Sequence, residues 1–461
     1  MSLQLYDTAF RAKREFVPIR PGAASIYLCG ATVQGIPHIG HVRSALNYDV
    51  LQRWLTYRGM NVYLIRNVTN IDDKILAKAT EAGQAWWQWA TIHEQAFIAA
   101  YDALGCLPTA REPRAADHIP QIVELIQRLI RRGHAYVSEG NVYFAVRTFP
   151  GYGALSGQRL GEMKQGEPDN RGKREVEDFT LWKAAKPGEP SWDTPWGPGR
   201  PGWHIECSAM AVTYFGSEFD IHGGGIDLIF PHHENERAQS LAAGDDFAQY
   251  WTHNAWVTMS GDKMSKSLGN TVAIHEMLKR FRAPELRYYL VSKHYRATIE
   301  YSEAALWDSV AAYERIENFL LRVSEVCGMP EASPEVPGDF AAAMDDDLGT
   351  PAAMAIVHGA VREGNAALDS GNTSTGLAIG ADVRAMTAVL GLDPLSMEWF
   401  GMPKPTADNA TVSALVPLVE ELLAKYGASP HARDLLSGAG IVVEDRPGGP
   451  KLSVGSVHLS D

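Results

Sequence analysis

Cysteine is scarce in this chain. The 461 residues include four cysteines: Cys29, Cys106, Cys207 and Cys327. Thiols so few and so far apart do not form the disulfide framework of a small secreted protein. We therefore expect each one to be a free buried thiol or a metal ligand, and we interpret Cys106 and Cys327 as free thiols.

Long apolar runs are also missing. No stretch comes near the roughly 18 to 20 apolar residues that a membrane-spanning helix needs. The N-terminal segment, MSLQLYDTAFRAKREF, has mixed polarity and lacks the apolar stretch of a signal peptide. We therefore expect a cytoplasmic protein that has no membrane partner.

The chain has no excess of positive charge. Its 42 lysines and arginines are outnumbered by 55 aspartates and glutamates, which gives a net charge of -13 and a pI near 5.6. This balance argues against a protein coated with positive charge for non-specific nucleic-acid binding. Basic tracks at 131–132, 279–282 and 293–296 could still contact nucleic acid locally, and each could equally be a solvated helix face.

A strand, helix and strand pattern is present near the N-terminus. Residues 25–30 are predicted to form a buried strand, 41–59 a helix, and 61–70 a second strand rich in β-branched residues. This order predicts a parallel βαβ unit, in which ligands bind at the carboxyl ends of the strands. We expect the sheet to resume over 218–230 and 254–259.

The middle of the chain interrupts this pattern. A helix is predicted over 118–132, followed by a hairpin that turns at Glu139-Gly140-Asn141. The stretch 148–202 is dense in glycine, proline and tryptophan and has weak periodicity. We interpret 115–200 as an insertion between the two halves of a nucleotide-binding fold.

From residue 303 onward the pattern is helical. Further helices are predicted over 338–368, 376–390 and 410–426, separated by breaks rich in proline and glycine. These segments predict a helical bundle that forms a separate domain. The first helix has one apolar face, made of Leu306, Val310, Tyr313, Ile316, Phe319 and Leu320.

The first candidate site is Pro37-His38-Ile39-Gly40-His41, between the first predicted strand and helix. A helix N-terminus offers unpaired N–H groups and partial positive charge, which suit a phosphate. Gly40 lets a ligand approach the backbone closely, and the imidazoles of His38 and His41 can donate to phosphate oxygens. Taken alone, the histidines could equally be plain cap or surface residues.

The second candidate site is the loop 261–270, GDKMSKSLGN. Its lysines, Lys263 and Lys266, can reach triphosphate oxygens as point charges on flexible stems. A loop rich in glycine and serine can also close over a nucleotide and relax afterwards. Taken alone, this loop is better explained as an exposed basic turn.

Together, HIGH after the first strand and KMSKS after the last resemble the paired signature of class I aminoacyl-tRNA synthetases. The resemblance implies that His38, Gly40 and His41 contact the phosphates of ATP. It also assigns Lys263 and Lys266 to catalysis, with Lys266 neutralising the departing pyrophosphate.

A third set of residues suits a metal ion. Cys29 ends the first predicted strand, Cys207 lies in GWHIECSAM, and His232 and Glu236 become i, i+4 neighbours if 230–236 is helical. Two thiolates, an imidazole and a carboxylate are ligands that zinc accepts, and we expect three loops to assemble them across the crevice. The alternative is two buried cysteines and a His-Glu cluster that starts a helix.

Longer matching stretches indicate one family. The chain resembles cysteinyl-tRNA synthetase over most of its length, and the resemblance places one Zn²⁺ on Cys29, Cys207, His232 and Glu236. The stretches that carry the resemblance are 28–41, 66–75, 201–210, 219–236, 261–270 and 344–353.

The resemblance also implies a substrate pocket. The residues expected to line the cysteinyl-adenylate pocket are Gly30, Thr32, Thr69, Trp203 and Asp227. The residues expected to contact ATP are Gly40, Gly225, Asp227 and Lys266.

The implied fold is an α/β Rossmann-type doubly wound parallel sheet with an inserted connective subdomain, followed by an α-helical bundle. The implied regions are 1–114 and 201–258 for the two halves of the catalytic domain, 115–200 for the insertion, 259–302 for the KMSKS loop and stem-contact region, 303–400 for a tRNA-binding bundle, and 401–461 for a small anticodon-side region.

The implied activity is that of a cysteine--tRNA ligase. Such an enzyme activates L-cysteine with ATP and Mg²⁺ and transfers it to the 3′ end of tRNA(Cys), and we expect it to act as a monomer. One alternative is the ligase that joins cysteine to glucosaminyl-inositol in mycothiol synthesis, and another is a non-catalytic paralogue that binds tRNA or zinc. The segment 344–353 favours the synthetase, whereas 418–440 is shorter and less basic than the arm expected there.

Overall fold

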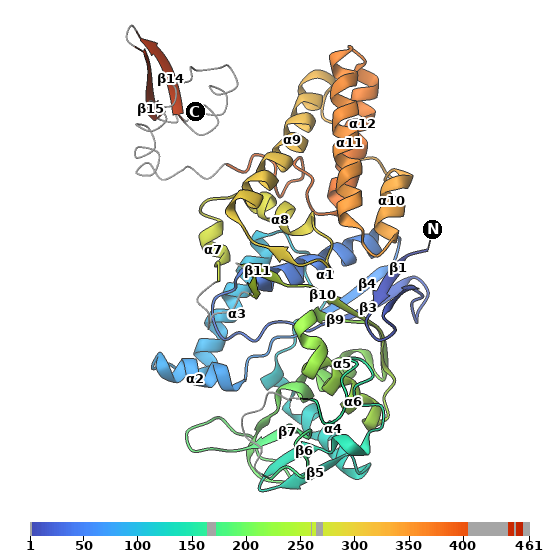
Figure 1. Cartoon of the computed structure of the whole chain (residues 1–461), viewed down its shortest axis with the longest axis vertical. Helices are drawn as coiled ribbons and strands as arrows, with labels where there is room; N and C mark the ends of the chain where they lie inside the picture. Colours follow the sequence, from blue (N-terminus) through green and yellow to red (C-terminus); the bar gives the residue numbers. More distant parts are fainter. Residues whose placement is uncertain are drawn as a thin grey trace. The chain divides into compact units, whose positions relative to one another are not determined.

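The computed structural model describes residues 2–163, 172–259, 261–263, 271–403, 441–446 and 449–454 (Figure 1). The chain divides into two compact units. One unit comprises residues 1–274 and 283–400, and the other comprises 275–282 and 401–461.

Part of the first unit is built on a parallel sheet. Its described strands, in spatial order, are β10 (Phe247–Asn254), β9 (Glu218–Gly225), β3 (Ala23–Leu28) and β4 (Asn61–Arg66). All three neighbouring pairs are parallel, and helix α1 (Ile39–Tyr57) connects β3 to β4. The strand order reverses direction between β3 and β9, which is where doubly wound sheets bind ligands. The predicted Rossmann-type fold is confirmed.

The prediction of a sheet strand over 254–259 was wrong. The strand that joins the central sheet is β10, and β11 (Val257–Met259) instead pairs with β12 (Asp262–Lys263) and β13 (Ile299–Glu300). The sequence of β10, FAQYWTHN, contains polar residues that are buried in the fold. It therefore lacks the apolar run that marks most parallel strands.

The predicted insertion contains its own antiparallel sheet. The hairpin of β5 (Ala135–Ser138) and β6 (Asn141–Phe144) is confirmed, and Glu139 and Gly140 both have positive φ at its turn. The sheet continues with β7 (Phe179–Ala184) and β8 (Gly199–Pro201), and α4 (Ile119–Arg131) precedes it. This layer shares one core with Ile205 and Ala238, so it packs onto the helices that return the chain to the central sheet.

Several helices position the site without having been predicted. They are α2 (Asp73–Glu81), α3 (Trp86–Ala103), α5 (Trp203–Phe215), α6 (Glu234–Ala243) and α8 (Ala283–Val291). The remaining short elements are the hairpin of β1 (Gln4–Asp7) and β2 (Ala12–Glu15), the helix α7 (Ile274–Met277), and the hairpin of β14 (Ile441–Arg446) and β15 (Gly449–Val454) in the second unit.

The predicted bundle is helical. All of the predicted apolar face of α9 (Glu303–Cys327) is buried. The predicted helix over 338–368 is broken into α10 (Gly338–Asp345) and α11 (Thr350–Asp369), because Asp347 and Leu348 adopt positive φ between them. Helix α12 (Thr373–Val389) follows, and the predicted helix at 410–426 lies outside the described residues. Among the residues that the structure describes, no helix is long and apolar enough to span a bilayer.

A buried arginine fastens α1 to the bundle. The Arg287 guanidinium on α8 pairs with the Asp49 carboxylate on α1, and it donates to the carbonyls of Leu104, Gly105 and Leu390. Asp49 also accepts from Arg53, at 2.8 Å. Burial acts to raise the pKa of Asp49, yet the Arg287 and Arg53 guanidinium groups hold that pKa below its usual value.

We predict that Asp49→Asn will lower the free energy of unfolding by about 3 to 5 kcal/mol, because it leaves the Arg287 charge buried without its counter-ion. Urea denaturation monitored by circular dichroism measures this loss. The matched control is Asp369→Asn, whose carboxylate pairs with Arg322 but is 68% exposed. The control should cost less than about 1 kcal/mol. Equal losses in the two variants would contradict the anchoring role.

Candidate active site and metal centre

A cavity of about 370 Å³ lies at the carboxyl ends of the central strands. Its wall includes the last or next residue of each strand: Leu28, Arg66, Gly225 and Asn254. The predicted site residues that line it are Cys29, Gly30, Thr32, His38, Gly40, His41, Trp203, Gly225 and Asp227. Segments far apart in the sequence therefore meet around one space.

The turn after β3 depends on a glycine. A Cβ atom on Gly30 would lie 1.8 Å from the Asn67 carbonyl oxygen, and the Gly30 N–H donates to the Asn67 side chain at 2.9 Å. Thr32 forms a backbone bridge to Thr69. Thr69 is 2% exposed and is not among the cavity-lining residues, so its direct contribution is to hold the loop that forms the wall.

The two histidines of HIGH form the N-terminus of α1. His38 is the N-cap, its Nδ1 accepts from the Gly40 N–H, and Nδ1 of His41 accepts from the His38 N–H, both at 3.2 Å. The two rings stack with centroids 3.7 Å apart. Because Nδ1 is an acceptor in each ring, the neutral ring carries its proton on Nε2. These hydrogen bonds thus fix the Nε2–H tautomer of each histidine, and that N–H can donate to a ligand.

Asp227 and Trp203 both line the cavity. Asp227 lies on a 3₁₀ turn (Ile226–Leu228) directly after β9 and accepts from the Trp256 indole N–H at 3.2 Å. It is the only acidic residue among the described residues that line the cavity. Trp203, the first residue of α5, stacks on the His232 ring at 4.2 Å.

The four proposed metal ligands converge beside this cavity, and one of them, Cys29, also lines it. The sulfurs of Cys29 and Cys207 are 3.7 Å apart, Cys29 Sγ lies 3.5 Å from Glu236 Oε1, and His232 Nε2 lies 3.1 Å from the same oxygen. All four donor atoms lie within 4.8 Å of one another. Ligands bound tetrahedrally to zinc at its usual bond lengths are about 3.3 to 3.8 Å apart. The spacing therefore fits one small divalent ion.

Burial shapes the chemistry of these ligands. None of the four is more than 7% exposed. Burial raises the pKa of both thiols, and neighbouring Cys207 and Glu236 raise the pKa of Cys29 further. Burial also lowers the pKa of His232 to about 3, so its imidazole is neutral and can donate a lone pair. A cation would relieve the cost of gathering thiolates and a carboxylate in a dry site.

The ligands come mostly from helices, so our prediction of three loops was wrong. Cys29 directly follows β3, Cys207 lies within α5, His232 lies in a π-helical turn (Ile229–His233), and Glu236 lies in α6. The predicted i, i+4 relation of His232 and Glu236 is confirmed by their 3.1 Å contact. Helical ligands are held more firmly than loop ligands, because their backbone is already hydrogen-bonded.

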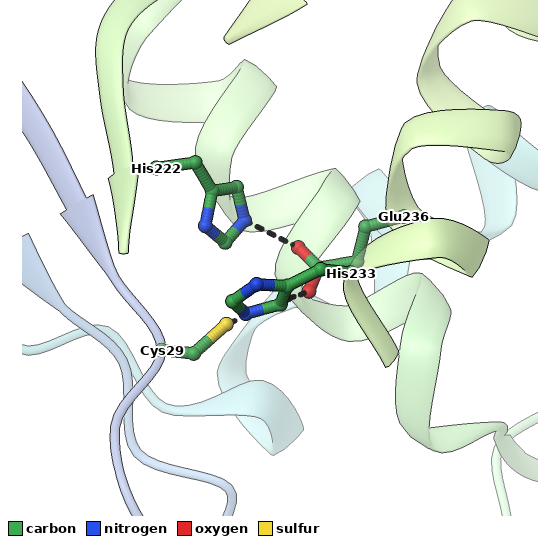
Figure 2. A group of neighbouring side chains, drawn as sticks. All are labelled: Cys29, His222, His233 and Glu236. Atoms are coloured by element: carbon green, nitrogen blue, oxygen red, sulfur yellow. Dashed lines mark hydrogen bonds and ion pairs between the residues drawn. The ribbon is translucent and has the colours of Figure 1, made fainter. Parts of the chain in front are cut away.

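Further histidines, which the sequence analysis missed, surround the ligands. His204 Nδ1 lies 2.9 Å from His232 Nδ1, and His222 Nε2 lies 2.9 Å from Glu236 Oε2. Figure 2 shows that His222 and His233 both point toward the Glu236 carboxylate, with the His233 ring next to the Cys29 sulfur. Cys29, His222, His233 and Glu236 form a second group with metal-ligand spacing. The histidines flanking the motif, in DIHGGG and PHHENE, were the available signal.

Of the KMSKS segment, residues 263–267, the structure describes only Lys263. Lys263 lies on the short strand β12, where its backbone pairs with Thr258. Lys266 lies outside the described residues.

Comparisons with known proteins identify the family and the fold. Residues 15–311 match the family described as tRNA synthetases class I (C) catalytic domain, and residues 339–394 match the DALR domain. Among solved structures, the fold is similar to a Mycobacterium tuberculosis methionyl-tRNA synthetase bound by methionyl-adenylate, with a TM-score of 0.60 and 15% identity over 80% of this chain and 92% of that one. A putative arginyl-tRNA synthetase from Campylobacter jejuni gives a TM-score of 0.52 at 12% identity, over 80% of this chain and 93% of its own.

Much closer sequence relatives are named cysteine--tRNA ligase. The protein from Streptomyces avermitilis is 56% identical over 99% of this chain and 100% of its own length. The protein from Streptomyces coelicolor is 56% identical over 99% of this chain and 76% of its own length. The chain therefore belongs to the cysteine--tRNA ligase family of class I aminoacyl-tRNA synthetases.

Proposed function

We propose that this protein activates L-cysteine with ATP to give cysteinyl-adenylate and then transfers the cysteinyl group to the 3′ end of tRNA(Cys). The observation that carries the proposal is the buried donor set of Cys29, Cys207, His232 and Glu236, which adjoins, through Cys29, the cavity that His38, Gly40 and His41 also line. A metal centre beside a phosphate-binding helix N-terminus suits an amino acid that has a thiol side chain.

The donor set fits Zn²⁺ in ligand type and spacing. When bound, Zn²⁺ would take the substrate sulfur as a further ligand and favour its thiolate form. Cysteine and serine differ only in S for O, and apolar contacts separate such close analogues by only about 10- to 200-fold. A soft thiolate binds zinc far better than a hydroxyl does, so ligation supplies the missing discrimination. The proposed role of the metal is therefore to select cysteine over serine.

The remaining residues orient the reacting groups. Asp227 is the acidic residue available to the substrate ammonium, and Trp203 packs beside the ring of His232. His38 and His41 donate through Nε2 to the phosphates of ATP, which enters with Mg²⁺, and Gly40 and Gly225 leave room for the nucleotide. Lys263 and Lys266 neutralise the departing pyrophosphate. The cysteine carboxylate attacks the α-phosphate in line, so catalysis rests on positioning and charge stabilisation.

The second step consumes the mixed anhydride. A ribose hydroxyl at the tRNA 3′ end attacks the carbonyl carbon of the adenylate, and AMP leaves. The family match extends through the DALR region at 339–394, which supports tRNA as the acceptor over glucosaminyl-inositol. The assignments of 303–400 to tRNA and of 401–461 to the anticodon side are part of this proposal, as are the monomeric state and the cytoplasmic location.

We predict that Cys207→Ser will lose bound zinc and will lower cysteine-dependent pyrophosphate exchange by more than about 100-fold, because the hard hydroxyl replaces a soft ligand. Metal analysis of the purified protein and the exchange assay measure the two effects. Cys327→Ser is the control, since this thiol lies on α9 and contacts the Thr373 carbonyl. A Cys207→Ser protein that kept both its zinc and its exchange activity would refute the metal assignment.

We also predict that His204→Leu will weaken zinc binding by about 10- to 100-fold while every ligand is retained. If His232 ligates through Nε2, its Nδ1–H donates to His204 Nδ1, and this bond fixes the orientation of the ring. Competition with a chelator measures the affinity. The control is His134→Leu, whose ring contacts Thr148 in the insertion. The orienting role would be excluded by equal zinc affinities in the two variants.

A further inference from the structure

A second cavity adjoins the catalytic cavity. It is an open groove of about 600 Å³, bordered by the loop before α1, the end of α2, the start of α3 and residues 271–273. Gln34 and His38 line both spaces. The groove therefore reaches the catalytic cavity at the residue that begins the phosphate-binding helix.

An ordered aromatic side chain forms one wall of this groove. The Trp89 indole N–H donates to the Gln34 carbonyl at 3.2 Å, and the Trp89 carbonyl lies 2.8 Å from His93 Nδ1. The Trp89 and His93 ring centroids are 4.3 Å apart, and Trp89 stays partly exposed. A tryptophan fixed to the loop that separates two cavities is a suitable stacking platform.

The charge of the groove is mixed. Lys78 and Glu81, both near the end of α2, line it together with the Trp89 ring. A binding site for free anions would contain several basic side chains and no neighbouring carboxylate. This composition instead favours a ligand that is recognised by an aromatic face, with one cation near its backbone.

We propose that this groove seats the single-stranded 3′ end of the acceptor tRNA, with a base stacked on Trp89. The inference rests on the proposed function, because the transfer step needs the terminal ribose inside the catalytic cavity. The nucleotides next to that ribose must then occupy a space that adjoins the cavity, and the groove shares the lining residues Gln34 and His38 with it. Bases of any sequence stack on tryptophan, and Lys78 can contact a phosphate.

The test compares two substitutions of Trp89 in the full-length enzyme. Trp89→Leu removes the aromatic face, and Trp89→Phe restores a face without the indole N–H. We expect Trp89→Leu to raise the KM for tRNA in aminoacylation by about 10-fold or more and Trp89→Phe to recover most of that loss. Cysteine-dependent pyrophosphate exchange, which needs no tRNA, should change by less than about 2-fold, well below the effect of a lost stacking contact.

The matched control is Trp87→Leu. Trp87 lies on the same helix, is 56% exposed and is not among the groove-lining residues, so its substitution should leave both assays unchanged. If wild-type enzyme activates cysteine but charges no tRNA, the proposed function fails. If wild-type enzyme charges tRNA and Trp89→Leu charges it with the same KM, only the groove assignment fails. A parallel loss of exchange and charging would also overturn the assignment, since the groove would then serve activation.

A binding measurement covers the case of a Trp89→Leu protein that folds poorly. A tRNA with 2-aminopurine in place of the base next to the terminal nucleotide is titrated with wild-type enzyme and with Trp89→Phe. Stacking should quench its fluorescence in both complexes, and a tRNA shortened by its single-stranded end should bind more weakly to both. Unchanged fluorescence in the wild-type complex would overturn the proposal.

Discussion

The arrangement of the catalytic half depends on the cost of burying Glu236 beside two cysteine thiols. The Glu236 side chain is 0% exposed, and the sulfur of Cys29 is 3.5 Å from its carboxylate. A carboxylate and thiolates in a dry site repel one another, and protonation or a cation is needed to hold them together. His222 and His232 contact the two oxygens of Glu236 but are themselves buried. A divalent ion would satisfy this set, and under the proposed function it would also bind the sulfur of the substrate cysteine.

The fold places this buried ligand set at the switch point of the sheet, between β3 and β9. Cys29 follows β3, while Cys207 lies in α5, His232 in the π-helical turn before α6, and Glu236 in α6 itself. The insertion packs its core against α5 and α6, with Ile205 and Ala238 contributing to that core. The insertion therefore packs against the helices that carry Cys207 and Glu236. Figure 1 shows α5 and α6 between the central sheet and the strands β5 to β7.

The sequence predicted an element best where the burial of one face produced a regular pattern of apolar residues. The apolar face of α9 was predicted because one side of that helix is buried, and the βαβ unit around α1 was predicted from its order of strand, helix and strand. Helix α5 was missed because an unbroken run from His204 to Ala211 is buried, so no polar face marks the period. Strand β10 was missed because its polar residues include His253, which contacts His233 in the interior. The ligand set was predicted from donor chemistry and family resemblance, whereas the outer histidines depend on tertiary contacts that spacing does not encode.

Helix α1 connects the two ends of the proposed reaction. Its N-terminus is capped by His38, between the catalytic cavity and the groove beside Trp89. Its C-terminal half is fixed to the bundle, because Trp54 donates to Asp345 of α10 at 3.2 Å and Asp49 pairs with Arg287 of α8. A helix held at both ends transmits displacement as a rigid element. Under the proposed function, the tRNA contacts the bundle while its 3′ end enters the groove, so its placement on the bundle would set the position of the acceptor end relative to HIGH.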